Sequence, residues 1–244
     1  MDGENNFPCM LPTIYCLLCL RQVVWSASLE SNGKRVRRLS WYGILQVICR
    51  WLCVLFFRIR ISGRENLPAK GGVLVLSNHQ SFLDPVLIGV GLSRPIHYMA
   101  RSDLFSHWLF RWVIRSLNAF PVKREGVDLR AIRKATELLR KEEVVVLFPE
   151  GTRTWTGALS PIRPGFTLIA RQGQAAILPA TIHGAFQAWP RSRRFLRPHP
   201  ISVMFGKPIY PREYLGKTAE ELRQSVQEAI LAIQREVLWK PERR

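Results

Sequence analysis

The sequence predicts an α/β domain with a largely parallel central sheet flanked by helices. From Ile61 onward, short apolar runs rich in β-branched residues alternate with longer helical runs, which is typical of strands joined by crossover helices. The chain has 244 residues, 47% of them hydrophobic, which suits one sizeable domain with attachments. Polar clusters directly follow two of the apolar runs, where ligand sites of such folds gather.

The predicted strands are Val73–Leu76, Ile96–Ala100, Ala119–Val122, Val144–Phe148, Ile177–Ile182 and Ile201–Phe205. The predicted helices are Val86–Leu92, Leu104–Ser116, Leu129–Lys141, Phe166–Arg171 and Ala219–Leu238. One basic, proline-rich insertion, WPRSRRFLRPHP (Trp189–Pro200), is predicted to be a loop.

Residues 1–60 are predicted to form an amino-terminal membrane-associating helical region, and residues 61–244 the α/β domain. The stretch Phe7–Leu20 follows acidic residues, unlike a signal peptide, and is shorter than the ~20 apolar residues of a spanning helix. The stretch Trp41–Phe57 carries Arg50 near its middle, which would cost roughly 2.5–3.5 kcal/mol inside a bilayer. Both stretches are therefore predicted to lie in the membrane interface on the cytoplasmic face, with one true span as the alternative.

The charge of the chain predicts an anionic partner. There are 36 basic and 18 acidic residues, a net charge of +18, which fits a membrane surface, nucleic acid or a phosphorylated substrate. Cations flank the stretch Trp41–Phe57, where each would contribute about 1 kcal/mol beside anionic head groups. They are Lys34, Arg35, Arg37, Arg38, Arg58 and Arg60.

All five cysteines fall in the first quarter of the chain, inside apolar stretches. Cys16 and Cys19 form a CxxC pair, which Cys49 and Cys53 could complete as a four-thiolate zinc site. Because the neighbouring residues are Leu, Ile, Val and Trp, we expect these cysteines to behave as small hydrophobic residues.

The first polar cluster, SNHQSFLD, follows the run Val73–Leu76. Asp84 precedes Pro85, which predicts a helix with Asp84 as its N-cap and Pro85 at its first position. Because proline disfavours the α region for the residue before it, we expect a compact turn between His79 and Asp84. In such a turn the carboxylate can reach one imidazole nitrogen and leave the other to accept a proton. On spacing alone, a plain helix cap beside an exposed loop histidine explains the same residues.

The second polar cluster, PEGTRT (Pro149–Thr154), follows the run Val144–Phe148. Gly151 permits a positive φ and a close backbone approach, and Arg153 offers a planar fork that suits a phosphate. If the two preceding strands are parallel, both clusters open onto the same edge of the sheet. A turn with a surface Glu150–Arg153 pair is the simpler alternative.

Together the two clusters resemble motifs of glycerolipid acyltransferases of the 1-acyl-sn-glycerol-3-phosphate acyltransferase family. NHQSFLD (Asn78–Asp84) is similar to that family's N-H-x-S-x-x-D motif, and FPEGTRT (Phe148–Thr154) to its F-P-E-G-T-R-S motif, with Thr154 in place of serine. FPVKR, which ends at Arg124, and ILPATI (Ile177–Ile182) resemble two further motifs in the family's order.

The resemblance implies acyl transfer from an acyl thioester, either acyl-CoA or acyl carrier protein, to the sn-2 hydroxyl of lysophosphatidic acid in the membrane. The product is phosphatidic acid, a phospholipid precursor. His79 is expected to take the hydroxyl proton and Asp84 to orient it. The expected substrate-binding residues are Arg124 and Arg153 on the phosphate, Glu150 and Gly151, which would shape the loop and hold the glycerol side, and Asn78 and Ser81 in support. No metal or other cofactor is implied.

Several alternatives stay open at this stage. Lys123 can equally take the role of Arg124, and the acceptor can be glycerol 3-phosphate or another lyso-lipid. The arginines of the loop Trp189–Pro200 are a hypothetical contact for the anionic acyl donor. The alternative from a different class is a non-catalytic basic protein that binds membranes or nucleic acid. Trp108 and Trp112 lie among apolar residues rather than in a basic stripe, which argues against a nucleic-acid partner.

Overall fold

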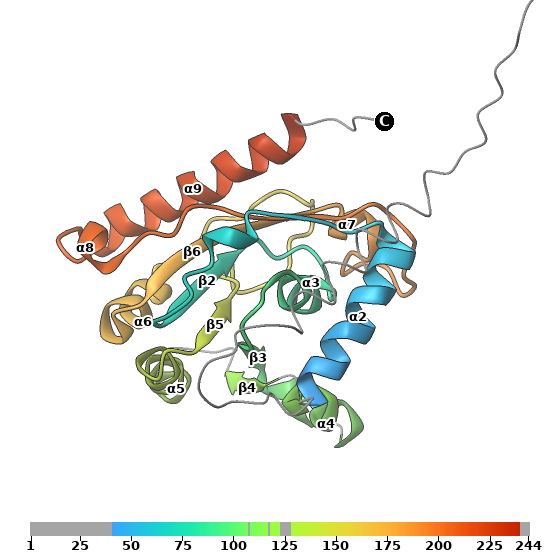
Figure 1. The fold of residues 1–244 in the computed structure, drawn as a ribbon, viewed down its shortest axis with the longest axis horizontal. Helices are drawn as coiled ribbons and strands as arrows, with labels where there is room; N and C mark the ends of the chain where they lie inside the picture. The colour runs from blue at the N-terminus through green and yellow to red at the C-terminus, as the bar shows by residue number, and fades with distance from the viewer. Residues whose placement is uncertain (1–40, 107, 117, 123–127, 240–244) are drawn as a thin grey trace, which may run out of the picture. The chain divides into compact units, whose positions relative to one another are not determined.

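The structure, a computed structural model, describes residues 41–106, 108–116, 118–122 and 128–239 (Figure 1). The described residues belong to one unit that begins at Trp41, so the helix α2 (Trp41–Phe57) is part of it, although the sequence places the domain boundary after residue 60. The stretch Phe7–Leu20, the cations Lys34–Arg38, the cysteines at 9, 16 and 19, and both Lys123 and Arg124 lie outside the described residues.

A seven-stranded, mostly parallel sheet forms the centre of the described unit, in the order β1-β7-β6-β2-β5-β3-β4. The strands are β1 (Arg60–Ser62), β2 (Val73–Ser77), β3 (Ile96–Arg101), β4 (Ala119–Val122), β5 (Val144–Leu147), β6 (Ala176–His183) and β7 (Ser202–Phe205). Strands β6, β2, β5, β3 and β4 run parallel to one another, whereas β7 is antiparallel to β6. Every residue of β2 is buried, as expected for a central parallel strand covered on both faces.

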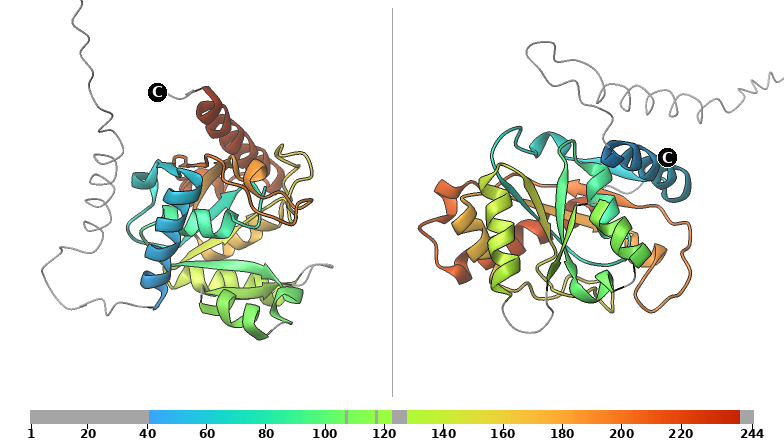
Figure 2. Two further views of the ribbon diagram at one scale, coloured as in Figure 1. Left: turned by 90° about the vertical axis from the view of Figure 1, so that its right-hand side faces the viewer. Right: turned by 90° about the horizontal axis from the view of Figure 1, so that it is seen from below.

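Helices cover both faces of the sheet. They are α2, α3 (Asp84–Gly91), α4 (Trp108–Ser116), α5 (Leu129–Arg140), α6 (Gly165–Gly173), α7 (Ala185–Ala188), α8 (Pro211–Tyr214) and α9 (Ala219–Trp239), with short 3-10 turns at Arg64–Asn66 and Ser102–Phe105. Alternate residues of β2 divide the core: Val73 and Val75 pack with α2 and α3, and Leu74 and Leu76 pack with α5, α6 and α9. The right-hand view of Figure 2 shows the strands between these two groups of helices.

The predicted fold class is confirmed, and the differences are local. Strand β1 was not predicted, because its three residues Arg60–Ser62 are too few to show a pattern. The predicted helix Leu104–Ser116 is a 3-10 turn, Ser102–Phe105, followed by α4. The single-turn helices α7 and α8 were also not predicted. The loop Trp189–Pro200 contains no helix or strand, as expected.

Helix α2 is fastened to α3 but presents an apolar face to the surroundings. The Gln46 side chain donates to the carbonyls of Gly89 and Leu92, at 2.7 and 2.9 Å. The exposed large apolar residues follow a helical spacing, which places them on one face. They are Val47, Ile48, Trp51, Leu52, Leu55 and Phe56. Among the described helices, none is long and apolar enough to cross a membrane.

The two cysteines of α2 are free thiols. Cys53 packs in the core, and its burial raises the pKa of the thiol to about 11. Cys53 therefore behaves as the small hydrophobic residue that its apolar neighbours predict. Within the described part of the chain, no three His, Cys, Asp or Glu side chains are grouped to hold a metal ion.

Candidate active site

The loops that follow β2 and β5 meet at one edge of the sheet, although some seventy residues separate them in sequence. The strands are parallel neighbours, with Val73 opposite Val144 and Leu76 opposite Leu147. Beyond the strand ends, the backbone N–H of Thr154 donates to the carbonyl of His79 at 2.8 Å. The backbone N–H of His79 donates to the Glu150 carboxylate at 2.6 Å. The two predicted clusters therefore form one hydrogen-bonded assembly.

His79 and Asp84 face each other, as the turn between them predicts. Nδ1 of the imidazole lies 2.7 Å from Oδ2 of Asp84. The carboxylate is fully buried, whereas 20% of the histidine side chain is exposed. The imidazole stacks on the Phe148 ring, with centroids 4.2 Å apart and an interplanar angle of 17°. With Nδ1 directed at the carboxylate and one ring face covered, Nε2 is the nitrogen left to meet a substrate.

The prediction that Asp84 caps α3 is wrong. The helix begins at Asp84, its N-cap position is Leu83, and no side chain caps it. The carboxylate instead turns back into the loop, where Oδ2 also accepts the backbone N–H groups of Gln80 and Ser81 at 2.6 and 2.7 Å. Pro85 still lies in the first turn of the helix. Oδ2 therefore holds both the histidine and the backbone that leads away from it.

Glu150 is buried and links its own loop, including Ser160, to the histidine loop. Oε1 accepts the backbone N–H of His79, and Oε2 accepts that of Ser160 at 2.9 Å. Burial raises the pKa of this carboxyl, although both N–H groups favour its charged form. The structure thus uses Glu150 between loops rather than in the simple surface pair with Arg153. Gly151 follows with φ 72°, and a Cβ there would lie 3.3 Å from the Arg163 guanidinium.

Arg153 lies flat on an aromatic ring beside the histidine loop. Its guanidinium carbon is 3.4 Å from the centroid of the Phe82 ring, which in turn packs on Trp189 at 5.1 Å. Burial lowers the pKa of Arg153, and the neighbouring Arg191 adds to that effect. Its buried Nη1 makes no hydrogen bond within the described residues. A planar cation with an unused donor is suited to an anionic ligand.

Arg191 supports the Arg153 backbone. One Arg191 Nη lies 3.3 Å from Oγ1 of Thr152 and 3.4 Å from the carbonyl of Arg153, and the guanidinium covers the Trp155 ring at 3.7 Å. Sequence reasoning missed Phe82, Phe148 and Trp189, and it expected Arg191 only as one of the loop arginines that could contact the acyl donor. Phe82 and Phe148 lie inside the two motifs, so their position was the only available signal.

Asn78 and Ser81 are occupied within the protein. The Asn78 carboxamide donates to the carbonyl of Ile182 at 2.9 Å and accepts its N–H at 2.7 Å. Oγ of Ser81 donates to the carbonyl of Trp189 at 2.8 Å. Both side chains are buried, so the structure brings them to the site as supports of the loop. Arg124 lies outside the described residues.

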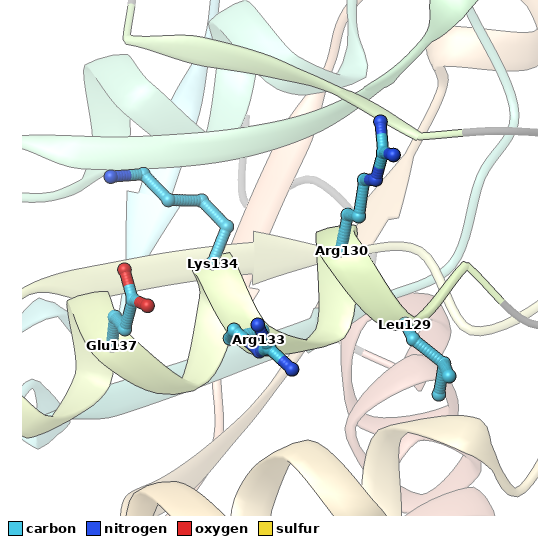
Figure 3. A pocket seen from close by; sticks show the side chains of 5 residues that line it. All are labelled: Leu129, Arg130, Arg133, Lys134 and Glu137. Carbon is cyan, nitrogen blue, oxygen red and sulfur yellow. The ribbon is translucent and has the colours of Figure 1, made fainter.

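Another group of basic residues lies on α5, around a surface hollow of about 420 Å³ (Figure 3). Figure 3 shows that all five lining residues come from this one helix. They are Leu129, Arg130, Arg133, Lys134 and Glu137. None of the site residues predicted from the sequence lines this hollow.

Comparison with known proteins places the chain in a family. A family model described as Acyltransferase matches residues 58–183, which include both loops. The 1-acyl-sn-glycerol-3-phosphate acyltransferase of Bacillus subtilis is 30% identical over 173 residues, which span 70% of this chain and 84% of that protein. This chain belongs to the 1-acyl-sn-glycerol-3-phosphate acyltransferase family. Members of the family are O-acyltransferases, so the protein is an enzyme of that class.

Two further relatives agree with this assignment. The 1-acyl-sn-glycerol-3-phosphate acyltransferase of Pseudomonas aeruginosa is 29% identical over 189 residues, covering 74% of this chain and 72% of that one. The crystal structure of the 1-acyl-sn-glycerophosphate acyltransferase PlsC from Thermotoga maritima matches with a TM-score of 0.68 and 25% identity. That match covers 96% of this acyltransferase and 94% of the Thermotoga chain.

Proposed function

We propose that this acyltransferase moves a fatty acyl group from an acyl thioester to the free sn-2 hydroxyl of lysophosphatidic acid, giving phosphatidic acid for phospholipid biosynthesis. The family supports the reaction class and the names of the relatives support the acceptor. The observation that carries the proposal is the contact of His79 with a buried Asp84 carboxylate at 2.7 Å, on a loop bonded to the one that bears Arg153.

His79 acts as the general base in this proposal. Nδ1–H donates to Asp84, which fixes the tautomer, and Nε2 takes the proton from the acceptor hydroxyl. The hydroxyl oxygen then attacks the thioester carbonyl carbon, the C–S bond breaks, and the proton passes from Nε2 to the departing thiolate. Because a thioester is already activated, a positioned base and an oriented acceptor are sufficient without a covalent enzyme intermediate.

Arg153 binds the acceptor phosphate in this proposal, together with Arg124. The support for Arg153 is its place beside the histidine loop, its fixed plane on Phe82 and its unused Nη1. Asp84 serves as the positioning residue of the base. Glu150, Gly151, Asn78 and Ser81 act through the shape of the loops, because their contacts are within the protein.

Membrane association accompanies this function, since the acceptor is a lipid. The exposed apolar face of α2 supports attachment to one leaflet, and we assign that leaflet to the cytoplasmic side. The partners are the membrane surface, the lipid acceptor and an anionic acyl donor, either acyl-CoA or acyl carrier protein.

The proposal is tested with the purified full-length protein, a panel of acceptors and both donors. The panel contains lysophosphatidic acid, glycerol 3-phosphate and lysophosphatidylcholine, and the products are identified by mass spectrometry. We expect phosphatidic acid as the main product. Equal or faster acylation of an acceptor without a phosphomonoester would overturn the acceptor assignment.

A further inference from the structure

The loop Trp189–Pro200, here called the arginine loop, exposes aromatic and cationic side chains beside the active site. Phe195 is 73% exposed, and the adjacent Arg194 lies 5.8 Å from its ring centroid. Leu196 and Arg197 are exposed as well. Phe195 and Leu196 are therefore two adjacent exposed apolar residues rather than a single scattered one.

Contacts attach this loop to the active-site loop. Arg191 bonds to Thr152 and to the Arg153 carbonyl, and it covers the ring of Trp155, which is itself 67% exposed. The Ser81 hydroxyl bonds to Trp189 at the start of the loop. The exposed aromatic residues therefore lie on structure that is continuous with His79 and Arg153.

The far end of the arginine loop returns to the end of α2. The backbone N–H of Ile201 donates to the carbonyl of Phe57 at 2.9 Å, directly after the exposed residues Leu55 and Phe56. The residue that follows the arginine loop is thus hydrogen-bonded to the last residue of α2. Arg58, between α2 and β1, is also exposed and adds a cation there.

We infer that the arginine loop, with Trp155, is a second membrane-contacting surface that seats the active site on an anionic bilayer. The amphipathic ring of a tryptophan such as Trp155 favours the depth of the lipid head groups, and an exposed Phe or Leu can enter the boundary between head groups and acyl chains. Arginines beside them keep their charge in the head-group layer, where each contributes about 1 kcal/mol with anionic lipid. The inference rests on the proposed function and adds a surface through which the acceptor is presented to His79.

An anionic acyl donor is the competing occupant of this surface. A soluble donor would use the arginine charges but would not depend on Phe195. Loss of the arginines would then raise the donor KM in solution. A bilayer uses both the charge and the ring. The two occupants are therefore distinguished by whether the loss of these residues weakens binding to lipid vesicles.

The test compares two triple variants of the full-length protein. The first carries Arg194→Gln, Phe195→Ala and Arg197→Gln in the arginine loop. The control carries Leu129→Ala, Arg130→Gln and Arg133→Gln on α5, around the hollow of Figure 3. Each set removes two exposed arginines and one exposed apolar side chain, since Leu129 is 67% exposed. Helix α5 packs on the opposite face of the sheet from α2, so the control tests whether the same loss of charge and apolar surface elsewhere on the protein weakens binding.

Binding is measured by co-sedimentation with vesicles of phosphatidylcholine, with and without anionic phosphatidylglycerol. We expect the loop variant to bind the anionic vesicles roughly 30-fold more weakly than wild type, or weaker still, because the two lost cations contribute about 2 kcal/mol and the lost ring adds to that. The α5 control should stay close to wild type. Adding Phe195→Trp to an otherwise wild-type chain should preserve binding. Equal binding of the loop variant, the control and the wild type would overturn the inference.

Kinetics separate the inference from the proposed function. The loop variant should lose kcat/KM with long-chain lysophosphatidic acid in vesicles but keep it with a short-chain, water-soluble analogue. Loss with both acceptors, together with a raised donor KM, would assign the surface to the donor instead and reject a bilayer contact. Failure of the proposed function would show differently, as inactivity of wild type on lysophosphatidic acid while its vesicle binding persists.

Discussion

His79–Asp84 and His97–Glu143 are both pairs of an imidazole and a carboxylate. They lie at opposite ends of the parallel strands of one sheet. The first follows the carboxyl end of β2, with 2.7 Å between nitrogen and oxygen, and the second lies at the amino ends of β3 and β5, with 3.9 Å. The histidines are similarly exposed, at 20% and 22%, but the carboxylates are 0% and 43% exposed. The difference between the two pairs therefore lies in the carboxylate.

What surrounds each carboxylate explains the contrast. Asp84 Oδ2 accepts two backbone N–H groups in addition to the histidine. At the other edge, burial lowers the pKa of His97, and the exposed Glu143 opposes that effect only in part. Exposed ion pairs contribute ~0–1 kcal/mol, whereas a buried carboxylate with several donors is fixed in place. A histidine–carboxylate pair is suited to orient a base only when the carboxylate itself is held.

The largest expected effect is on activity, from loss of the imidazole. His79→Ala should lower kcat/KM roughly 10³- to 10⁴-fold, because general-base catalysis typically contributes up to that much. His97→Ala is the matched control and should stay within about threefold of wild type, because its carboxylate partner is exposed. Both are measured with lysophosphatidic acid under initial-rate conditions. Comparable losses in the two variants would show that the pairs do not differ in function.

The next effect tests the carboxylate itself. Asp84→Asn keeps the size of the side chain but removes the charge that orients the imidazole, so kcat should fall roughly 10²-fold with little change in the acceptor KM. Unfolding in urea should also show a loss of about 1.5–3 kcal/mol, from hydrogen bonds to a charged group. Glu143→Gln should change neither quantity measurably. A wild-type kcat in the Asp84→Asn enzyme would show that the Asp84 charge does not orient the imidazole.

A smaller effect is expected from Phe82, which supports Arg153, the proposed ligand of the phosphate, rather than the base. Phe82→Leu removes the ring under Arg153 and should raise the acceptor KM roughly 5- to 30-fold, the equivalent of ~1–2 kcal/mol of cation–π contact, while kcat changes little. Phe82→Tyr should restore the wild-type KM. The control is Tyr210→Leu, which removes the ring near Arg212 at 5.8 Å. A fall in kcat without a rise in KM would contradict this positioning role.

The smallest effect concerns Glu150 and pH. Its pKa is raised in the folded protein, so the folded state binds the proton more tightly than the unfolded chain does. The contribution of Glu150 to the free energy of unfolding is therefore present at low pH and decreases as the pH rises above the ordinary value of 4.5. Glu150→Gln should remove this decrease, as measured by urea unfolding across that range. Identical pH slopes in the two proteins would show that the ionised carboxyl is fully compensated by its N–H donors.

The sequence predicts the elements whose patterns are local and misses those defined by distant partners. Val73–Leu76 is apolar at every position and is a central strand. Arg60–Ser62 is a strand only because β7 lies beside it. The turn before Pro85 predicts the contact of His79 with Asp84, but the same residues suggest a helix cap that does not form.

Whether a residue lies in the site is easier to predict than what the residue does there. Glu150, Asn78 and Ser81 were expected among the substrate-binding residues, and the hydrogen bonds of their side chains are with other groups of the protein, mostly backbone groups. A polar side chain after a strand can face a ligand or satisfy the backbone of a neighbouring loop, and its residue type is the same in both cases. Apart from its place inside the motif, Phe82 gives no sequence signal for its role, because its partner is a cation seventy-one positions later that only the folded sheet brings near.

Asn78 completes the hydrogen-bond ladder toward β6 with its side chain instead of its main chain. His79, the next residue, is therefore free of β6, and both of its main-chain groups bond to the loop after β5. A displacement of that loop would reach His79 through the Thr154 N–H and the Glu150 carboxylate, which both bond to its main chain. Residues that adjust the histidine should accordingly be sought along the β5 side.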